Sequence, residues 1–231
     1  MVRRQSSEPF ILINFKTYLE STGKRAVELS KKMEAVASNM DVKVGVAPQF
    51  CDIEQVASQV QIPVFSQHVD PVTPGAFTGH VLAESVRAAG ASGTIINHSE
   101  RNIRLLEIEN AIERAREVGL TTVTCAGTAK LAAAVALAEP DMVAIEPPEL
   151  IGSGRAVSKE RPEIVSESVK RIRSVNPKVG ILCGAGITTG EDVYAALKLG
   201  AEGVLVASGV VKAPRPEDVL MDFCKAVRKF V

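Results

Sequence analysis

The sequence contains no tryptophan, few aromatic residues and no excess of charge of either sign. Aromatic residues make up 4% of the 231 residues, and 27 lysines and arginines balance 27 aspartates and glutamates. A chain without net charge has no general attraction for nucleic acids or for anionic membrane surfaces. We therefore expect neither a nucleic acid nor a membrane as partner, and any anionic ligand must be bound by a local arrangement of groups.

Long apolar segments and paired cysteines are also missing. No apolar run approaches the roughly 18 to 20 residues that a membrane-spanning helix needs. The first residues, MVRRQSSEPF, include arginines but no apolar stretch, so we expect no secretory signal. The four cysteines, Cys51, Cys125, Cys183 and Cys224, form no C-x-x-C pair. We expect reduced, mostly buried thiols in a cytoplasmic protein.

Eight short apolar runs rich in β-branched residues recur along the chain. The predicted strands are residues 10–14, 42–47, 62–66, 93–97, 121–125, 141–146, 178–183 and 203–207. Each run is apolar almost throughout. This pattern is typical of strands that are covered on both faces in a parallel sheet.

Stretches with helical periodicity separate these strands. The predicted helices include residues 23–40, 110–118, 129–138, 160–175, 190–200 and 216–231. Hydroxyl side chains provide candidate N-caps, Thr188 or Thr189 for the helix at 190–200 and Ser21 or Thr22 for the first helix. The strand spacing fits one strand, one helix and two short loops, and no linker interrupts the series. Eight such units predict a (β/α)8 barrel, with residues 1–231 forming a single domain.

Polar side chains gather where three of the predicted strands end, which is the face of such a barrel that holds the active site. Asn14 and Lys16 close the first strand and, being two residues apart, point the same way. The fourth strand leads into His98 and Glu100, and the sixth ends at Glu146. Each residue alone has an ordinary alternative: an edge lysine, a packing histidine or a charge at a helix start. Their convergence on one face predicts a reactive site.

The motifs at these strand ends, taken in order, resemble the triosephosphate isomerase family. They are N-x-K on the first strand, H-S-E-R on the fourth, E-P with I-G-x-G on the sixth, and the turns CGAGIT and ASG on the last two. The resemblance covers essentially the whole chain, and NHSE, GAFTGH and EPPELIG are similar to the shorter archaeal branch. It implies a TIM barrel that interconverts dihydroxyacetone phosphate and D-glyceraldehyde 3-phosphate through an enediolate, in glycolysis and gluconeogenesis. It implies no cofactor and no metal ion.

The resemblance also implies a role for each residue of the site. Glu146 is the general base, His98 is a neutral imidazole that polarises the substrate carbonyl, and Lys16 faces the phosphate and the developing oxyanion. Glu100 has a supporting role near Lys16. The residues assigned to substrate binding are Asn14, Phe15, Lys16, Ile151, Gly186, Ala207 and Ser208, of which the last four supply backbone N–H groups to the phosphate.

Two further segments resemble functional loops of the family. Residues 147–156 resemble its closing lid, which begins with two prolines here. Ala207 and Ser208 stand where the family commonly has two glycines, and Ala185 interrupts a glycine-rich turn.

The segment PVTPGAFTG lies between His68 and His80 and resembles the family's protruding loop, which docks into a partner subunit. A metal site at His68, Asp70 and His80 is the alternative, but their spacing matches no familiar ligand set. The resemblance implies a homo-oligomer, with a tetramer favoured over a dimer.

Other functions remain compatible with the same barrel. One alternative is another phosphosugar isomerase, or an aldolase that forms a Schiff base at Lys16. A second alternative is a non-catalytic barrel that binds sugar phosphates as a regulator. The presence of Lys16, His98 and Glu146 together favours a catalytic protein, because a degenerate site usually loses at least one such residue.

Overall fold

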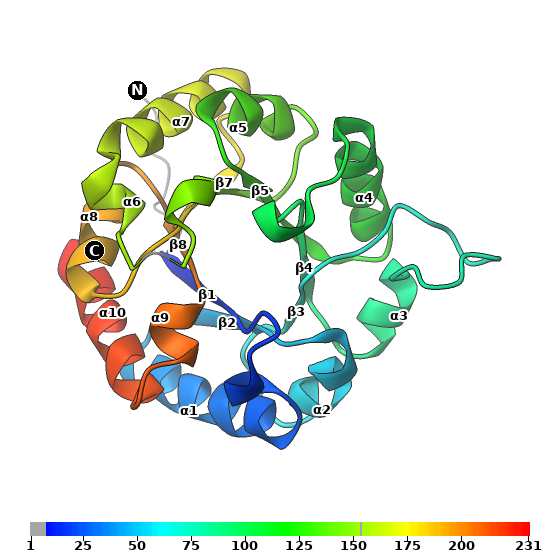
Figure 1. Cartoon of the computed structure of the whole chain (residues 1–231), viewed down its shortest axis with the longest axis horizontal. Helices are drawn as coiled ribbons and strands as arrows, with labels where there is room; N and C mark the ends of the chain where they lie inside the picture. Colours follow the sequence, from blue (N-terminus) through cyan, green and yellow to red (C-terminus); the bar gives the residue numbers. More distant parts are fainter. Residues whose placement is uncertain (1–7, 153) are drawn as a thin grey trace.

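The computed structural model describes residues 8–152 and 154–231. Two parts of the chain lie outside the described residues, namely residues 1–7 and Ser153. The first covers most of the segment in which we expect no secretory signal, and the second lies inside the predicted lid. Eight parallel strands form one sheet in the order β2-β1-β8-β7-β6-β5-β4-β3, surrounded by helices (Figure 1). The strands are β1 (Phe10–Asn14), β2 (Lys43–Ala47), β3 (Phe65–Ser66), β4 (Gly93–Ile96), β5 (Thr121–Ala126), β6 (Met142–Ile145), β7 (Gly180–Gly184) and β8 (Gly203–Val206). The predicted (β/α)8 barrel is confirmed.

The two outer strands of this order, β2 and β3, meet at a thin seam. A parallel bridge joins Val46 to Val64, and the N–H of Val46 donates to the carbonyl of Pro63 at 3.0 Å. The strand predicted at 62–66 is shortened to two residues here. Pro63 has no N–H, so this stretch cannot pair as a regular strand on both sides. The barrel is therefore nearly closed.

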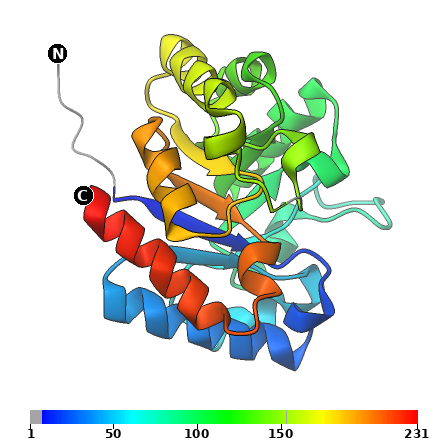
Figure 2. The ribbon, with the colours of Figure 1, turned by 60° about the vertical axis from the view of Figure 1, so that its left-hand side comes forward.

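Helices cover the outside of the barrel (Figure 2). They are α1 (Lys24–Met40), α2 (Ile53–Ala57), α3 (Ala83–Ala88), α4 (Leu105–Glu117), α5 (Ala129–Ala136), α6 (Val157–Glu160), α7 (Pro162–Val175), α8 (Gly190–Lys198), α9 (Ser208–Val211) and α10 (Pro216–Phe230). Short 3-10 turns are η1 (Leu19–Ser21), η2 (Phe50–Asp52), η3 (Ser99–Arg101) and η4 (Pro148–Leu150). All six predicted helices are present. The start of α4 lies earlier than predicted, because the Glu107 carboxylate accepts from the Arg104 N–H at 2.7 Å and fixes the first turn.

The N-cap prediction is right for α8 and wrong for α1. Thr189 is the N-cap of α8, as predicted, and its hydroxyl accepts from the N–H of Asp192. Neither Ser21 nor Thr22 caps α1, whose N-cap is Gly23. The hydroxyls of Ser21 and Thr22 instead donate to the carbonyl of Tyr18, at 3.2 and 2.9 Å, and stabilise the preceding turn.

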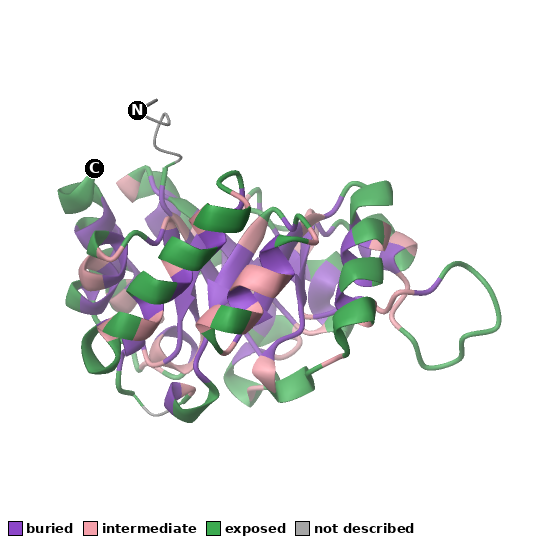
Figure 3. Ribbon diagram, turned by 90° about the horizontal axis from the view of Figure 1, so that it is seen from above, coloured by how far each residue is buried: buried purple, intermediate pink, exposed green. Residues whose placement is uncertain are grey.

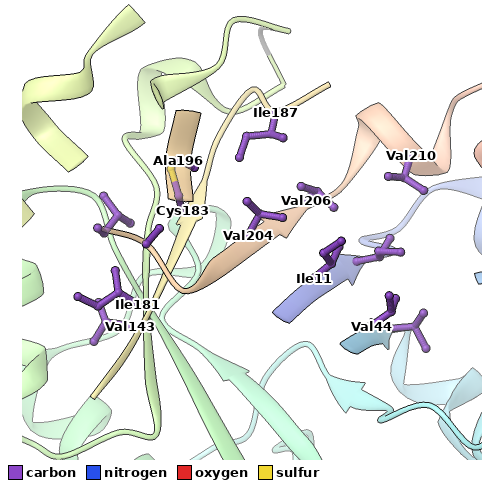
Figure 4. Packing of buried hydrophobic residues seen from close by; sticks show 14 of the residues in the cluster. Ile11, Val44, Val143, Ile181, Cys183, Ile187, Ala196, Val204, Val206 and Val210 are labelled. Carbon is purple, nitrogen blue, oxygen red and sulfur yellow. The ribbon is translucent and has the colours of Figure 1, made fainter. Parts of the chain in front are cut away.

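The apolar core has two layers, and the alternation of side chains along each strand separates them. The strands are buried between the lumen and the helices, whose outer faces are exposed (Figure 3). Ile11 (Figure 4) packs outward against the helices, as does Ile13, whereas Leu12 packs into the barrel lumen. The other buried side chains of the lumen cluster are Ala47, Phe65, Ile95, Val123, Cys125, Ala144, Leu182 and Leu205. The next inward position on β1 is Asn14, and Lys16 lies in the turn that follows, so the end of the strand brings both residues to one mouth of the barrel.

The cysteines are free thiols, of which Cys51 is exposed and Cys125, Cys183 and Cys224 are buried. Burial raises the pKa of Cys183 and of Cys224 to about 12. No described helix has the length and apolarity needed to traverse a bilayer.

One segment projects from the body of the barrel, namely residues 70–82 between β3 and α3 (Figure 1). Its base is closed by two hydrogen bonds, from the Asp70 N–H to the Val81 carbonyl at 2.9 Å and from the Val81 N–H to the Asp70 carboxylate at 2.6 Å. His68 is buried and pairs with Asp70 at 3.1 Å, whereas His80 is exposed on the loop. Burial lowers the pKa of His68. The described ranges contain no group of three or more His, Cys, Asp or Glu residues that could hold a metal ion.

Candidate active site

The first functional element is the end of β1. Lys16 has a φ of 47°, a left-handed conformation that costs a non-glycine residue about 1–3 kcal/mol. Its N–H donates to the Asn14 side-chain oxygen at 2.9 Å. The amide of Gln67 donates to the Lys16 carbonyl at 2.9 Å and to the Ala47 carbonyl at 3.0 Å. These bonds hold the turn that brings the Lys16 side chain, which is buried, into the barrel mouth.

Phe15 is the one predicted binding residue whose side chain the structure keeps away from the site. It is fully buried in the core layer between sheet and helices. The reason is its parity, because it lies between two residues that point into the barrel and so points outward. Its side chain therefore does not reach the polar residues of the site, and the assignment of Phe15 to substrate binding stays a prediction.

The end of β4 positions His98. Asn97 has a φ of 57°, and its side chain donates to the Cys125 carbonyl and accepts from the Ile103 N–H, both at 3.0 Å. His98 is the N-cap of η3, and its Nδ1 accepts from the Glu100 N–H at 3.2 Å. A nitrogen that accepts a hydrogen bond carries no proton, so the ring is neutral and its proton lies on Nε2. That proton faces the cavity, as a carbonyl-polarising group requires.

Glu100 links the lysine to the histidine. Its Oε1 lies 2.8 Å from Lys16 Nζ, and its Oε2 lies 3.5 Å from His98 Nδ1. The Glu100 side chain is 56% exposed, whereas that of Lys16 is 10% exposed. Since one partner is solvated, the ion pair is weak enough for an anionic ligand to compete for the ammonium.

Glu146 follows β6 and is buried. Its N–H donates to the Ala126 carbonyl at 3.0 Å, which extends the pairing of β6 with β5. Among the described residues its Oε2 has no hydrogen-bond partner, although His98 Nε2 lies 3.4 Å away. A buried carboxylate oxygen without a hydrogen-bond partner is costly to the fold. Burial and the nearby Glu146 charge raise the pKa of the Cys125 thiol, so Cys125 remains protonated.

Gly184 leaves the space that Glu146 occupies. A Cβ at this position would lie 2.7 Å from Glu146 Oε1 and would also overlap Glu146 Cγ. We expect Gly184→Ala to displace the carboxylate and to lower kcat at least roughly tenfold, because small misplacements of catalytic groups are costly. Steady-state assays check this, and circular dichroism monitors the fold. An unchanged kcat in a folded variant would show that the position of Glu146 is not held by this contact.

One cavity at this mouth of the barrel collects the predicted residues, apart from Phe15 and Glu100. Its lining consists of Asn14, Lys16, His98, Glu146, Ile151, Gly152, Gly154, Ala185, Gly186, Ile187, Thr188, Leu205, Val206, Ala207, Ser208 and Gly209. The Asn14, Lys16, His98 and Glu146 side chains are all at least nine-tenths buried. An anionic, oxygen-rich small molecule with an acidic C–H group would meet a base, a neutral imidazole and a cation here.

Small residues form another side of the cavity. Ser208 begins α9, so its N–H has no acceptor within the helix. Ala185 and Gly186 have φ values of 69° and 70°, and a Cβ on Gly186 would collide with the Arg155 carbonyl. The turn therefore packs directly against the end of the predicted lid. The N–H of Ile151 donates to the Pro148 carbonyl at 3.2 Å and is occupied in this conformation.

Known proteins of one family resemble this chain over most of its length. The sequence model described as triosephosphate isomerase matches residues 9–227. The chain is 52% identical to the triosephosphate isomerase of Methanosarcina barkeri over 219 residues, which cover 95% of this chain and 99% of that protein. It is 48% identical to the enzyme of the same name from Methanocaldococcus jannaschii over 217 residues, 94% of this chain and 99% of the relative. The chain belongs to the triosephosphate isomerase family.

A solved structure extends the comparison to the fold. The crystal structure of triosephosphate isomerase from Bartonella henselae superposes with a TM-score of 0.76 at 20% identity, over 96% of this chain and 100% of that chain. The barrel is thus the same while four-fifths of the aligned residues differ. Family membership makes the chain an isomerase. The relatives from methanogenic archaea agree with the archaeal branch that the motifs indicated.

Sequence reasoning missed Gln67, Asn97 and Gly184, which hold Lys16, His98 and Glu146. One signal was available, since Gln67 and Asn97 are polar residues at strand ends, the location that identified the site itself. Their partners are backbone carbonyls and N–H groups of other strands, and these pairings become visible only in three dimensions.

Proposed function

We propose that this chain interconverts dihydroxyacetone phosphate and D-glyceraldehyde 3-phosphate through an enediolate. The observation that carries the proposal is the meeting of the Lys16 ammonium, the His98 Nε2–H and the Glu146 carboxylate in one buried cavity. The roles follow the mechanism known for triosephosphate isomerases in general, in which a glutamate base works with a neutral histidine. They are assigned here to this chain's own residues.

Glu146 removes a proton from the carbon beside the substrate carbonyl and returns it to the neighbouring carbon. Its Oε2, which has no hydrogen-bond partner among the described residues, is free to accept that proton. His98 donates from Nε2 to the carbonyl oxygen, where negative charge develops. Lys16 stabilises the same charge and the phosphate, and Asn14 fixes the turn from which Lys16 extends.

The phosphate is bound by backbone N–H groups of Ile151, Gly186, Ala207 and Ser208. The start of α9 supports this proposal, because its first N–H groups face the cavity without helical acceptors. The Ile151 N–H is available only after its bond to the Pro148 carbonyl breaks. Phosphate binding would therefore be coupled to a change in the lid at residues 147–156.

A lid is needed because an enediolate phosphate exposed to water loses inorganic phosphate. Closure also excludes water and strengthens each charge contact in the cavity. Gly152 and Gly154 have φ values of 69° and 71°, a conformation that allows this part of the segment to reshape.

The test is a coupled assay of the purified protein with D-glyceraldehyde 3-phosphate, in which we expect rapid formation of dihydroxyacetone phosphate. An aldolase acting through Lys16 would instead yield a borohydride-trapped adduct. A non-catalytic barrel would bind the substrate without turnover. Either of these results, in place of isomerisation, would refute the proposal.

The assembly and location belong to the same proposal. We expect a single-domain protomer and a homotetramer in the cytoplasm, acting in glycolysis and gluconeogenesis. The projecting segment 70–82, with Phe77 45% exposed, supports docking into a second copy. Light scattering measures the assembly, and a monomer at micromolar concentration would contradict it.

A further inference from the structure

The first turn of α6, which follows the lid, makes three contacts with the β7–α8 loop and the first turn of α8. The N–H of Val157 donates to the Ala185 carbonyl at 3.2 Å. The hydroxyl of Ser158 donates to the Asp192 carbonyl at 3.0 Å, and Lys159 Nζ lies 2.8 Å from Asp192 Oδ1. Residues 157–159 therefore anchor the end of the lid to the loop after β7, through Ala185, and to the first turn of α8, through Asp192.

The other oxygen of Asp192 holds the cavity wall. Its Oδ2 accepts from the N–H groups of Thr188 and Thr189 at 3.0 and 2.9 Å, and from the Thr188 hydroxyl at 3.4 Å. Asp192 is 4% exposed, and Thr188 lines the cavity next to Gly186. Burial opposes ionisation, but the Lys159 ammonium and these donors hold the pKa of Asp192 below its usual range. One charged carboxylate thus joins the cavity wall to the lid anchor.

Helix capping accounts for only part of this arrangement. An aspartate at the third position of a helix commonly accepts from the N-cap N–H, as Asp192 does from Thr189. Capping does not require Lys159, which belongs to a different helix and has a side chain that is 46% exposed. Capping also does not require the hydrogen bond that Asp192 Oδ2 accepts from the N–H of Thr188. The additional contacts all lead from α6 to the wall of the cavity.

We propose that Asp192 and Lys159 are positioning residues. Together they fix the position of the lid anchor, residues 157–159, relative to the phosphate-side turn, residues 185–188. This inference rests on the proposed function and adds to it a link between lid closure and phosphate binding. Breaking the Lys159–Asp192 contact loosens the lid anchor relative to the turn that receives the phosphate. The closed state becomes less stable, while Lys16, His98 and Glu146 stay in place.

The chemistry of the intermediate provides a specific readout. If the lid opens before Glu146 returns the proton, the enediolate expels inorganic phosphate. The C–O bond to phosphate breaks with its electrons leaving on the phosphate, the enediolate electrons form the new C=C bond, and the resulting enol is protonated on carbon to give methylglyoxal. The step needs no oxidant or reductant. The amount of inorganic phosphate released per isomerisation therefore measures how often the lid opens before the proton has been returned.

The experiment compares wild type with Lys159→Met, Lys159→Arg and Asp192→Asn. For Lys159→Met and Asp192→Asn we expect KM for D-glyceraldehyde 3-phosphate to rise roughly three- to thirtyfold. We also expect more inorganic phosphate per turnover and a smaller change in kcat. Lys159→Arg keeps the positive charge, so its KM and its phosphate release per turnover should be close to those of wild type.

The matched control is Glu191→Gln. Glu191 is the other partner of Lys159, at 3.3 Å, and its side chain is 87% exposed. We expect its kcat, KM and phosphate release to equal those of wild type. A Lys159→Met variant with wild-type KM and phosphate release would overturn the inference, and so would a fall in melting temperature as its only effect. An inactive wild type would instead refute the proposed function.

Discussion

Replacing Glu146 with glutamine is expected to lower kcat by about 10²- to 10⁴-fold, the range typical of a lost positioned base. Glutamine has the same shape as glutamate but cannot accept a proton at neutral pH. The site otherwise stays intact, because the Glu146 N–H still pairs with the Ala126 carbonyl and Gly184 still leaves room for the side chain. KM should change much less than kcat, since the Glu146 carboxylate acts on a carbon-bound proton and not on the phosphate.

The coupled assay measures this loss, and exchange of solvent deuterium into the substrate identifies the step. The variant should incorporate deuterium at a rate reduced in proportion to kcat. Glu167→Gln is the matched control, because Glu167 is exposed on α7 and pairs only with Arg171 in the described contacts. We expect wild-type activity from it. A Glu146→Gln variant that retained more than a tenth of wild-type kcat would remove Glu146 from the role of base.

Replacing Lys16 with methionine should lower kcat/KM by about 10³-fold. A pair of unit charges about 4 Å apart contributes on the order of 4 kcal/mol at an effective dielectric constant near 20, and each 1.4 kcal/mol corresponds to roughly a tenfold change. Methionine keeps much of the apolar stem, so packing in the buried position is largely preserved. Loss of the ammonium also leaves the Glu100 carboxylate, which lies 2.8 Å from Lys16 Nζ, as an uncompensated negative charge close to the site. Both effects disfavour a doubly charged ligand.

Steady-state kinetics and the dissociation constant for inorganic phosphate check this prediction together. Binding of phosphate should weaken along with kcat/KM, because the Lys16 charge serves both the bound phosphate and the oxyanion. Lys198→Met is the control, since Lys198 is exposed and lies over the Tyr194 ring, 4.9 Å from its centroid. Intact phosphate affinity in Lys16→Met would restrict the lysine to the oxyanion, and unchanged kcat/KM would exclude it from the reaction.

Local sequence pattern was sufficient to predict the barrel and to bring Asn14, Lys16, His98 and Glu146 together at one face of it. The eight apolar runs carry their own periodicity, and parity along β1 places Asn14 and Lys16 on one side before any packing is known. The same rule turns the Phe15 side chain outward, into the core between the sheet and the helices.

Contacts between distant segments were beyond such reasoning. Gln67 reaches the backbone of β1 and β2, and Lys159 reaches across from α6 to Asp192. Neither side chain sits in a motif whose spacing requires the contact. The N-cap prediction for α1 was wrong for a related reason. The Ser21 and Thr22 hydroxyls have more than one nearby backbone group to bond, and the conformation of the whole turn selects among them.

The alternation of side chains along β1 also bears on how such a chain can change over evolutionary time. Ile11 and Ile13 contribute to holding the helices against the barrel, while Asn14 and Lys16 belong to the reactive mouth. Substitutions at outward positions act on unfolding, and substitutions at the last inward positions act on turnover. Selection for heat tolerance and selection for speed therefore fall on different residues of one short stretch, residues 10–16, and a lineage can adapt to one without losing the other.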